Sequence, residues 1–122
     1  MTFEWRQYLE VAESLASNGG EANERSAVSR AYYSVFCSAR NWLHENQPTL
    51  RMRGIGGSHK QVWDEFDHRH NTRERKQIAT VGRRLLKARH AVDYNDRVGD
   101  TAKKSQEAIR NAKTVLTLLA AL

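Results

Sequence analysis

Residues 23–45, NERSAVSRAYYSVFCSARNWLHE, carry the strongest helical pattern in the chain. Apolar side chains recur there at steps of four, three, four and three residues: Val28, Tyr32, Val35, Ala39 and Trp42. This spacing places them on one face of an α-helix. Ala31, Phe36 and Leu43 widen the face. We therefore expect a central helix with neighbours on two sides.

Four more helical segments are expected around this one. The first covers residues 3–17, with Thr2 as N-cap and Gly19 beyond its end. After an aperiodic stretch at 46–57, Ser58 and Gln61 form a capping box that predicts a short helix to about residue 68. A fourth helix is expected over 72–93, and Asp100 is the expected N-cap of the last. The fold class is therefore all-α, an up-and-down bundle of four to five helices.

Length and composition limit the classes of protein to be considered. At 122 residues the chain is expected to form one domain over 1–122. No apolar run approaches the roughly 20 residues that span a bilayer, and the N-terminus lacks the pattern of a signal peptide. We expect a cytoplasmic protein that does not bind membranes. The lone Cys37 lies among apolar neighbours and is expected to be a small buried side chain.

Positive charge is concentrated in one segment. Residues 69–90 hold eight Lys or Arg and a single acid, which gives a net charge of +7, whereas the whole chain has +6. A local basic surface attracts phosphates or an acidic partner. No aromatic residue interrupts this segment until Tyr94, so the sequence offers weak support for a platform on which bases stack.

Arg89 occupies an unexpected place in the fourth helix. At 3.6 residues per turn it lies within about 40° of the apolar position Leu85. A charged group on a buried stripe needs a partner, and Asp93 follows at i+4. Gly82, on the same side two turns earlier, would leave room for another backbone or a ligand.

A second group of polar side chains faces away from that stripe. Arg83, Lys87 and Tyr94 lie within about 60° of His90, whereas Arg84 is about 120° from it. An imidazole can take the 2′-hydroxyl proton of RNA near neutral pH, and a guanidinium can hold the phosphate and stabilise its developing charge. Arg83 or Arg84 with His90 is therefore a candidate pair for RNA cleavage without a metal.

Other kinds of site have less support. His59, His68 and His70 lie near several acids but lack the spacing of a zinc site, so neither a metal nor another cofactor is expected. The glycine-rich residues 54–57 precede the expected helix start at Ser58, so an anion could bind at the N-terminus of that helix.

Three stretches resemble the HEPN-domain family, the small helical domains of many prokaryotic toxin–antitoxin and defence systems. They are SAVSRAYYSVFCSARNWL (26–43), GGSHKQVWDEF (56–66) and LLKARHAVDYND (85–96). The paired Tyr32 and Tyr33 and the segment from Arg89 to Tyr94 are the most specific parts. The resemblance implies a four- or five-helix bundle, a homodimer, and a nucleotidyltransferase-type antitoxin as a possible partner.

The resemblance leaves two functions open. In the ribonuclease branch, an Arg and a His separated by four to six residues line the dimer cleft, which fits Arg83 or Arg84 with His90. Aligning the chain on RHAVDY instead puts the family's arginine at Arg89 and places Tyr94 where a cleaving member carries His. That branch resembles members that bind RNA, nucleotide or a partner without cleaving. For it, the expected binding residues are Lys87, Arg89, Asp93 and Tyr94.

Overall fold

The computed structural model describes residues 2–51, 55–68 and 70–122, apart from the side chains of 55–57. These residues form five helices: α1 (Gln7–Asn18), α2 (Glu21–Asn46), α3 (Ile55–Phe66), α4 (Arg73–Tyr94) and α5 (Thr101–Ala120). The described residues include no strand. The expected all-α fold is therefore confirmed.

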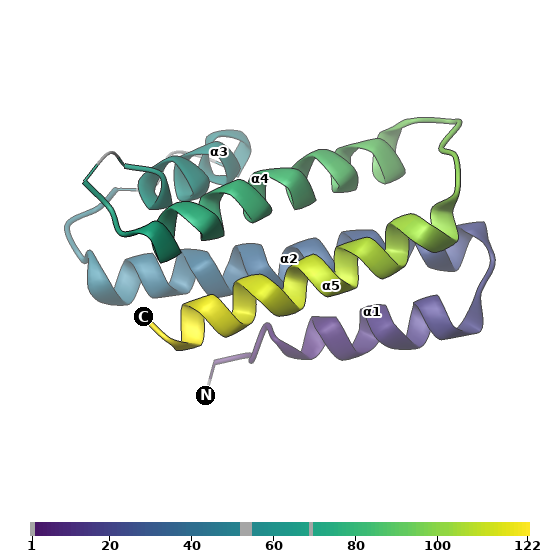
Figure 1. Ribbon diagram of the computed structural model, residues 1–122, viewed down its shortest axis with the longest axis horizontal. Helices are drawn as coiled ribbons and strands as arrows, with labels where there is room; N and C mark the ends of the chain where they lie inside the picture. Colours follow the sequence, from purple (N-terminus) through teal and green to yellow (C-terminus); the bar gives the residue numbers. More distant parts are fainter. Residues whose placement is uncertain (1, 52–54, 69) are drawn as a thin grey trace.

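Helices α1, α2, α4 and α5 run up and down, and α3 is an additional helix beside α4 (Figure 1). The central position predicted for the second helix is confirmed, because α2 contacts each of the other four helices. Within the described parts of the chain, no helix is both long and apolar enough to cross a membrane.

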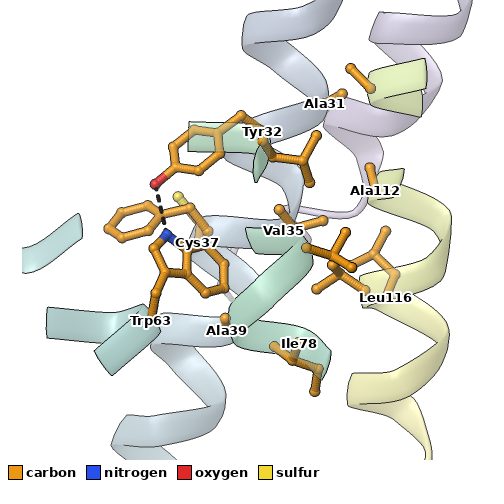
Figure 2. Close-up of a cluster of buried hydrophobic side chains, with 14 of the residues drawn as sticks. Ala31, Tyr32, Val35, Cys37, Ala39, Trp63, Ile78, Ala112 and Leu116 are labelled. Carbon is orange, nitrogen blue, oxygen red and sulfur yellow. Dashed lines mark hydrogen bonds between the residues drawn. The ribbon is translucent and has the colours of Figure 1, made fainter. Parts of the chain in front are cut away.

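The core is one cluster of buried side chains to which all five helices contribute (Figure 2). Its largest members are Trp63, Tyr32 and Phe66, each with no exposed surface. Trp63 on α3 fills the space beside Gly82 on α4, where an added Cβ would lie 2.4 Å from two ring carbons. The expectation that Gly82 admits a backbone or a ligand is therefore wrong, since an indole ring occupies the space. Cys37 is buried, as expected.

Two helix starts carry a side-chain cap, of which only the one at Asp100 is predicted from the sequence. The Thr72 hydroxyl accepts a hydrogen bond from the Arg75 amide at 3.2 Å, and the Asp100 carboxylate accepts one from the Lys103 amide at 3.2 Å. Asp100 adopts a left-handed conformation, φ 48°, which Asp tolerates better than most residues. These contacts fix the starts of α4 and α5.

The predicted start of the first helix is wrong. The helix begins at Gln7, after Arg6, and Thr2 does not cap it. The amides of Gln7 and Tyr8 bond to carbonyls three residues back, which makes a tighter turn than an α-helix. Phe3 precedes this turn and packs edge-on against Trp5, with 5.0 Å between ring centroids.

The predicted start of the third helix is also wrong. The helix begins at Ile55, so Ser58 and Gln61 lie inside it and do not form a capping box at its start. An anion site at a helix beginning with Ser58 is excluded by the same observation. Glycine at 56 and 57 does not prevent the helix from starting at Ile55, because glycine costs only about 1 kcal/mol in a helix. Gly54 lies outside the described residues.

The last turn of α4 is held by a side chain from α2. The guanidinium of Arg25 donates to the carbonyl oxygens of Val92 at 3.0 Å, Asn95 at 2.6 Å and Asp96 at 3.0 Å. The final carbonyls of a helix have no hydrogen-bond donor within the helix. Arg25 donates to one of them and to two carbonyls just beyond the helix. This contact fixes the end of α4 that carries Asp93 and Tyr94.

Candidate functional site

The side chain of Arg89 is the centre of a polar cluster between α2, α3 and α4. Its Nε donates to Oδ2 of Asp93 at 2.9 Å, which confirms the predicted i,i+4 pair. The guanidinium carbon lies 5.3 Å from the ring centre of Tyr33 and 5.7 Å from that of Tyr94. Only 12% of the Arg89 side chain is exposed. The guanidinium is thus held in one orientation by an ion pair and two rings.

The ion pair with Asp93 uses only one of the three guanidinium nitrogens of Arg89. Among the described residues, its only hydrogen bond is the one from Nε to Asp93. The hydroxyl of Ser29 donates to the same Asp93 oxygen at 3.4 Å. Asp93 therefore orients Arg89 through one side of the guanidinium, and both Nη groups have no acceptor among the described residues.

The buried Trp63 and Tyr32 and the partly buried His59 form a hydrogen-bonded chain beside Arg89. Nε1 of Trp63 donates to the Tyr32 hydroxyl at 3.3 Å (Figure 2). That hydroxyl lies 2.7 Å from Nδ1 of His59. An indole N–H can only donate. Because the buried Tyr32 O–H has no other acceptor among the described groups, it donates to Nδ1, and neutral His59 carries its proton on Nε2. Burial strongly raises the pKa of Tyr32, so the hydroxyl stays protonated.

His59 is kept neutral by its surroundings. Burial lowers the pKa of its imidazole, and the nearby positive charges of Arg89 and His90 lower it further. The ring stacks on Phe36 with 4.0 Å between centroids and a 10° angle. A protonated His59 would turn Nδ1 into a donor and leave the Tyr32 O–H without an acceptor. These surroundings favour the neutral form of His59, which presents Nε2 as a hydrogen-bond donor when Nδ1 accepts from Tyr32.

His90 and Tyr94 form the exposed side of the cluster. Their ring centroids are 5.6 Å apart, and 67% of Tyr94 is exposed. Lys87, one turn before His90 on α4, is exposed as well. We call Tyr33, His59, Arg89, His90, Asp93 and Tyr94 the Arg89 cluster. Of the residues expected from sequence, it unites Arg89, His90, Asp93 and Tyr94.

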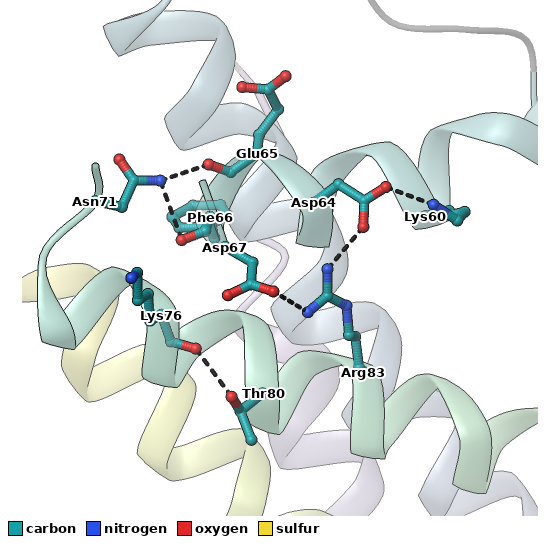
Figure 3. Close-up of polar contacts among 9 residues, drawn as sticks. All are labelled: Lys60, Asp64, Glu65, Phe66, Asp67, Asn71, Lys76, Thr80 and Arg83. Carbon is teal, nitrogen blue, oxygen red and sulfur yellow. Dashed lines mark hydrogen bonds and ion pairs between the residues drawn. The ribbon is translucent and has the colours of Figure 1, made fainter. Parts of the chain in front are cut away.

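Arg83 has a different set of partners. Its Nη1 donates to Asp67 at 2.6 Å and its Nη2 to Asp64 at 2.7 Å (Figure 3). The hydrogen bond from Arg83 to Asp67, followed by that to Asp64, raises the pKa of Arg83. Both terminal nitrogens of Arg83 are thus bound to carboxylates of α3 and of the turn after it. Asp64 also forms an ion pair with Lys60, with 2.7 Å between Nζ and Oδ2.

Arg84 lies on another side of α4. It is exposed and lines a small cavity of about 140 Å³ together with Lys104 and Asn111 of α5. His90 instead influences His59 on α3. The structure therefore places the side chains of Arg83 and Arg84 in surroundings different from those of His90.

The basic segment presents less free charge than its composition suggests. Besides Arg83, Arg75 is partly buried, with its guanidinium carbon 5.0 Å from the Trp42 ring centre and 5.4 Å from that of Phe66. Burial lowers the pKa of Arg75. Arg69 lies outside the described residues. The positive charge available to a ligand is thus concentrated on fewer side chains.

The histidines considered for a metal site are not gathered together. His68 and His70 lie beyond α3 with 5.5 Å between ring centroids, whereas His59 belongs to the Arg89 cluster. In the portion of the chain that the structure describes, no group of three or more His, Cys, Asp or Glu could hold a metal ion.

The family model described as HEPN domain matches residues 6–122, which is nearly the whole chain. No curated protein and no solved structure matches the chain.

Proposed function

Because the chain belongs to the HEPN domain family, we propose that it binds phosphate groups of RNA or of a nucleotide through the Arg89 cluster. One observation carries the proposal. Arg89 is oriented through Nε by Asp93, while its two Nη groups have no acceptor within the described residues. Two parallel N–H groups match two oxygens of a phosphate.

The surroundings of Arg89 favour such binding. The ion pair with Asp93 and the rings of Tyr33 and Tyr94 fix the guanidinium before the ligand arrives, which reduces the entropy lost on binding. Lys87 and His90 are exposed next to Arg89 in the sequence and supply further donors. Arg83, by contrast, would have to release two carboxylates to bind a phosphate.

The second candidate function is metal-independent cleavage of RNA. Two observations on His90 favour it. The side chain is exposed and follows Arg89 directly in the sequence, and it lies close enough to His59 to lower the pKa of that residue. An imidazole would take the proton of the 2′-hydroxyl, and the resulting alkoxide would attack the phosphorus to form a 2′,3′-cyclic phosphate. The bond from phosphorus to the 5′-oxygen would break, and that oxygen would take a proton from the imidazolium or from water. Arg83 or Arg84 was the arginine expected from sequence, whereas the geometry favours Arg89 for steadying the phosphate.

One experiment separates the two functions. End-labelled cellular RNA is incubated with the purified protein in EDTA, and both cleavage and retention on a filter are measured for the parent, His90→Ala, Arg89→Ala and the control Arg110→Ala. Binding without cleavage, lost in Arg89→Ala only, is the expected result. Cleavage lost in His90→Ala would identify a ribonuclease, and no binding by the parent would contradict both functions.

The biological setting is part of the proposal. We propose a cytoplasmic homodimer that acts in a toxin–antitoxin or defence system, with a nucleotidyltransferase-type antitoxin as its partner. Light scattering of the purified protein should give twice the mass of the chain. A monomer at concentrations where RNA is bound would contradict the dimer but not the phosphate site.

A further inference from the structure

A groove runs along α2 between the start of α1 and the start of α3. Its volume is about 420 Å³, and its lining includes Tyr8, Arg30, Tyr33, Phe36, Arg40 and His59. Tyr33 and His59 belong both to this groove and to the Arg89 cluster. The groove therefore adjoins the proposed phosphate site.

The floor of the groove is a stripe on α2. Arg30, Tyr33, Cys37 and Arg40 follow one another at steps of three, four and three residues, so they share one helix face. Ten residues of helix separate Arg30 from Arg40, a distance of about 15 Å between their backbones. The stripe is thus long enough for more than one nucleotide.

The groove combines positive charge with flat surfaces. The guanidinium carbon of Arg30 lies 5.0 Å from the Tyr8 ring centre, and that of Arg40 lies 5.8 Å from the Trp5 ring centre. The described residues that line the groove include two arginines and no acid. Aromatic rings and guanidinium planes are the surfaces on which unpaired bases stack, and arginines neutralise phosphates.

We infer that this groove binds unpaired nucleotides of single-stranded RNA as an extension of the Arg89 cluster. The inference rests on the proposed function, because one strand would place a phosphate at Arg89 and its neighbouring bases in the groove. Duplex RNA does not fit, since its bases are stacked on one another and cannot reach these rings. The neutral His59 sits at the junction and offers its Nε2–H to a base or phosphate oxygen.

The groove supplies aromatic rings, which the basic segment of α4 lacks. No aromatic residue lies within that segment before Tyr94, but the fold brings α1, α2 and α3 together so that Trp5, Tyr8 and Tyr33 gather beside arginines of α2. The base-stacking surface therefore lies on a helix other than the one that carries most of the positive charge.

The test compares ligands that use the groove with ligands that do not. Fluorescence anisotropy is recorded for a labelled unstructured oligouridylate, the corresponding RNA duplex and labelled UMP. The proteins are the parent, Arg30→Gln/Arg40→Gln, Arg89→Ala and the control Arg110→Gln. The groove variant should bind the oligouridylate about tenfold or more weakly, with a shallower salt dependence, and should keep its affinity for UMP. Arg89→Ala should weaken both.

The possible failures are distinguishable. If the groove variant binds the oligouridylate as well as Arg110→Gln does, the groove inference is overturned while the phosphate site stands. If the parent binds none of the three ligands, the proposed function fails and the groove inference fails with it. A groove variant whose mass in light scattering changes while its RNA affinity does not would identify the groove as a contact between copies of the chain and overturn the inference.

A second double variant separates the effect of charge from that of base stacking. Arg30→Lys/Arg40→Lys keeps the charge but removes the flat guanidinium surfaces, so it should lose affinity for the oligouridylate and retain most of the salt dependence. Equal affinity of this variant and the parent would contradict base stacking in the groove. Circular dichroism of each variant provides the check on folding.

Discussion

The indole ring of Trp63 on α3 lies against the backbone of Gly82 on α4, and a Cβ at Gly82 would come within 2.4 Å of its Cε3 and Cζ3 atoms. Both residues are buried, and Trp63 also donates to the Tyr32 hydroxyl. The position of Trp63 therefore links the packing of α3 on α4 to the hydrogen bonds around His59.

Gly82→Ala should destabilise the fold, because the fully buried indole of Trp63 would have to shift away from the new Cβ. Overpacking of this kind costs about 1 to 3 kcal/mol, more than the roughly 1 kcal/mol that alanine gains over glycine in a helix. Urea unfolding measures the change. Gly99→Ala is the matched control, since a Cβ there meets nothing within 4 Å. Equal stability of the two variants would show that Trp63 does not press on Gly82.

Arg25→Ala should lower the free energy of unfolding by about 1.5 to 3 kcal/mol. It removes a charged donor from three carbonyl oxygens at the end of α4, and such hydrogen bonds contribute in this range. Thermal and urea unfolding provide the measurement, with Arg110→Ala on the exposed side of α5 as control. Hydrogen exchange should also speed up in the last turn of α4, and unchanged exchange there would contradict the capping role.

The stability of the protein should fall as the pH drops from neutral to mildly acidic values. The pKa of His59 is lower in the folded protein than its ordinary value of about 6.5. The unfolded chain therefore takes up this proton at a higher pH than the folded one, so stability is lost as the pH falls through 6.5 and below. His59→Gln should flatten this dependence and the exposed-site control His44→Gln should not. The same slope in parent and His59→Gln would refute this role of His59.

Arg83→Gln should leave RNA affinity within about twofold of the parent. Its guanidinium is bound by Asp64 and Asp67, and these partly exposed pairs contribute little to stability. Anisotropy with the labelled oligouridylate measures the affinity. Loss of binding or of RNA cleavage in Arg83→Gln would instead support the pair of Arg83 and His90.

Local sequence patterns predicted those features that depend on residues within one or two helical turns. The apolar steps of residues 23–45 predicted α2, Asp100 was identified as the N-cap of α5, and the i,i+4 spacing identified the pair of Arg89 and Asp93. Each of these contacts is decided by the geometry of a single helix.

The remaining features depend on contacts between distant residues. Tyr32 and His59 are separated by 27 positions, and Arg83 and Asp64 by 19. A helical wheel shows which side of α4 Arg83 occupies, but not that acids of α3 lie opposite it. The groove along α2 is formed by three helices, so no single stretch of sequence could reveal it. The edge-on rings that replace the first turn expected near Phe3 are also a packing effect.

The most direct test of the Arg89 cluster is the affinity of single-stranded RNA at several salt concentrations for the parent, Arg89→Ala and Arg110→Ala. Loss of one charge-assisted phosphate contact should weaken binding by Arg89→Ala about 10- to 100-fold. It should also reduce the slope of log affinity against log salt by about 0.7, while Arg110→Ala behaves like the parent. An affinity and slope in Arg89→Ala that equal those of Arg110→Ala would contradict the proposal that Arg89 binds phosphate.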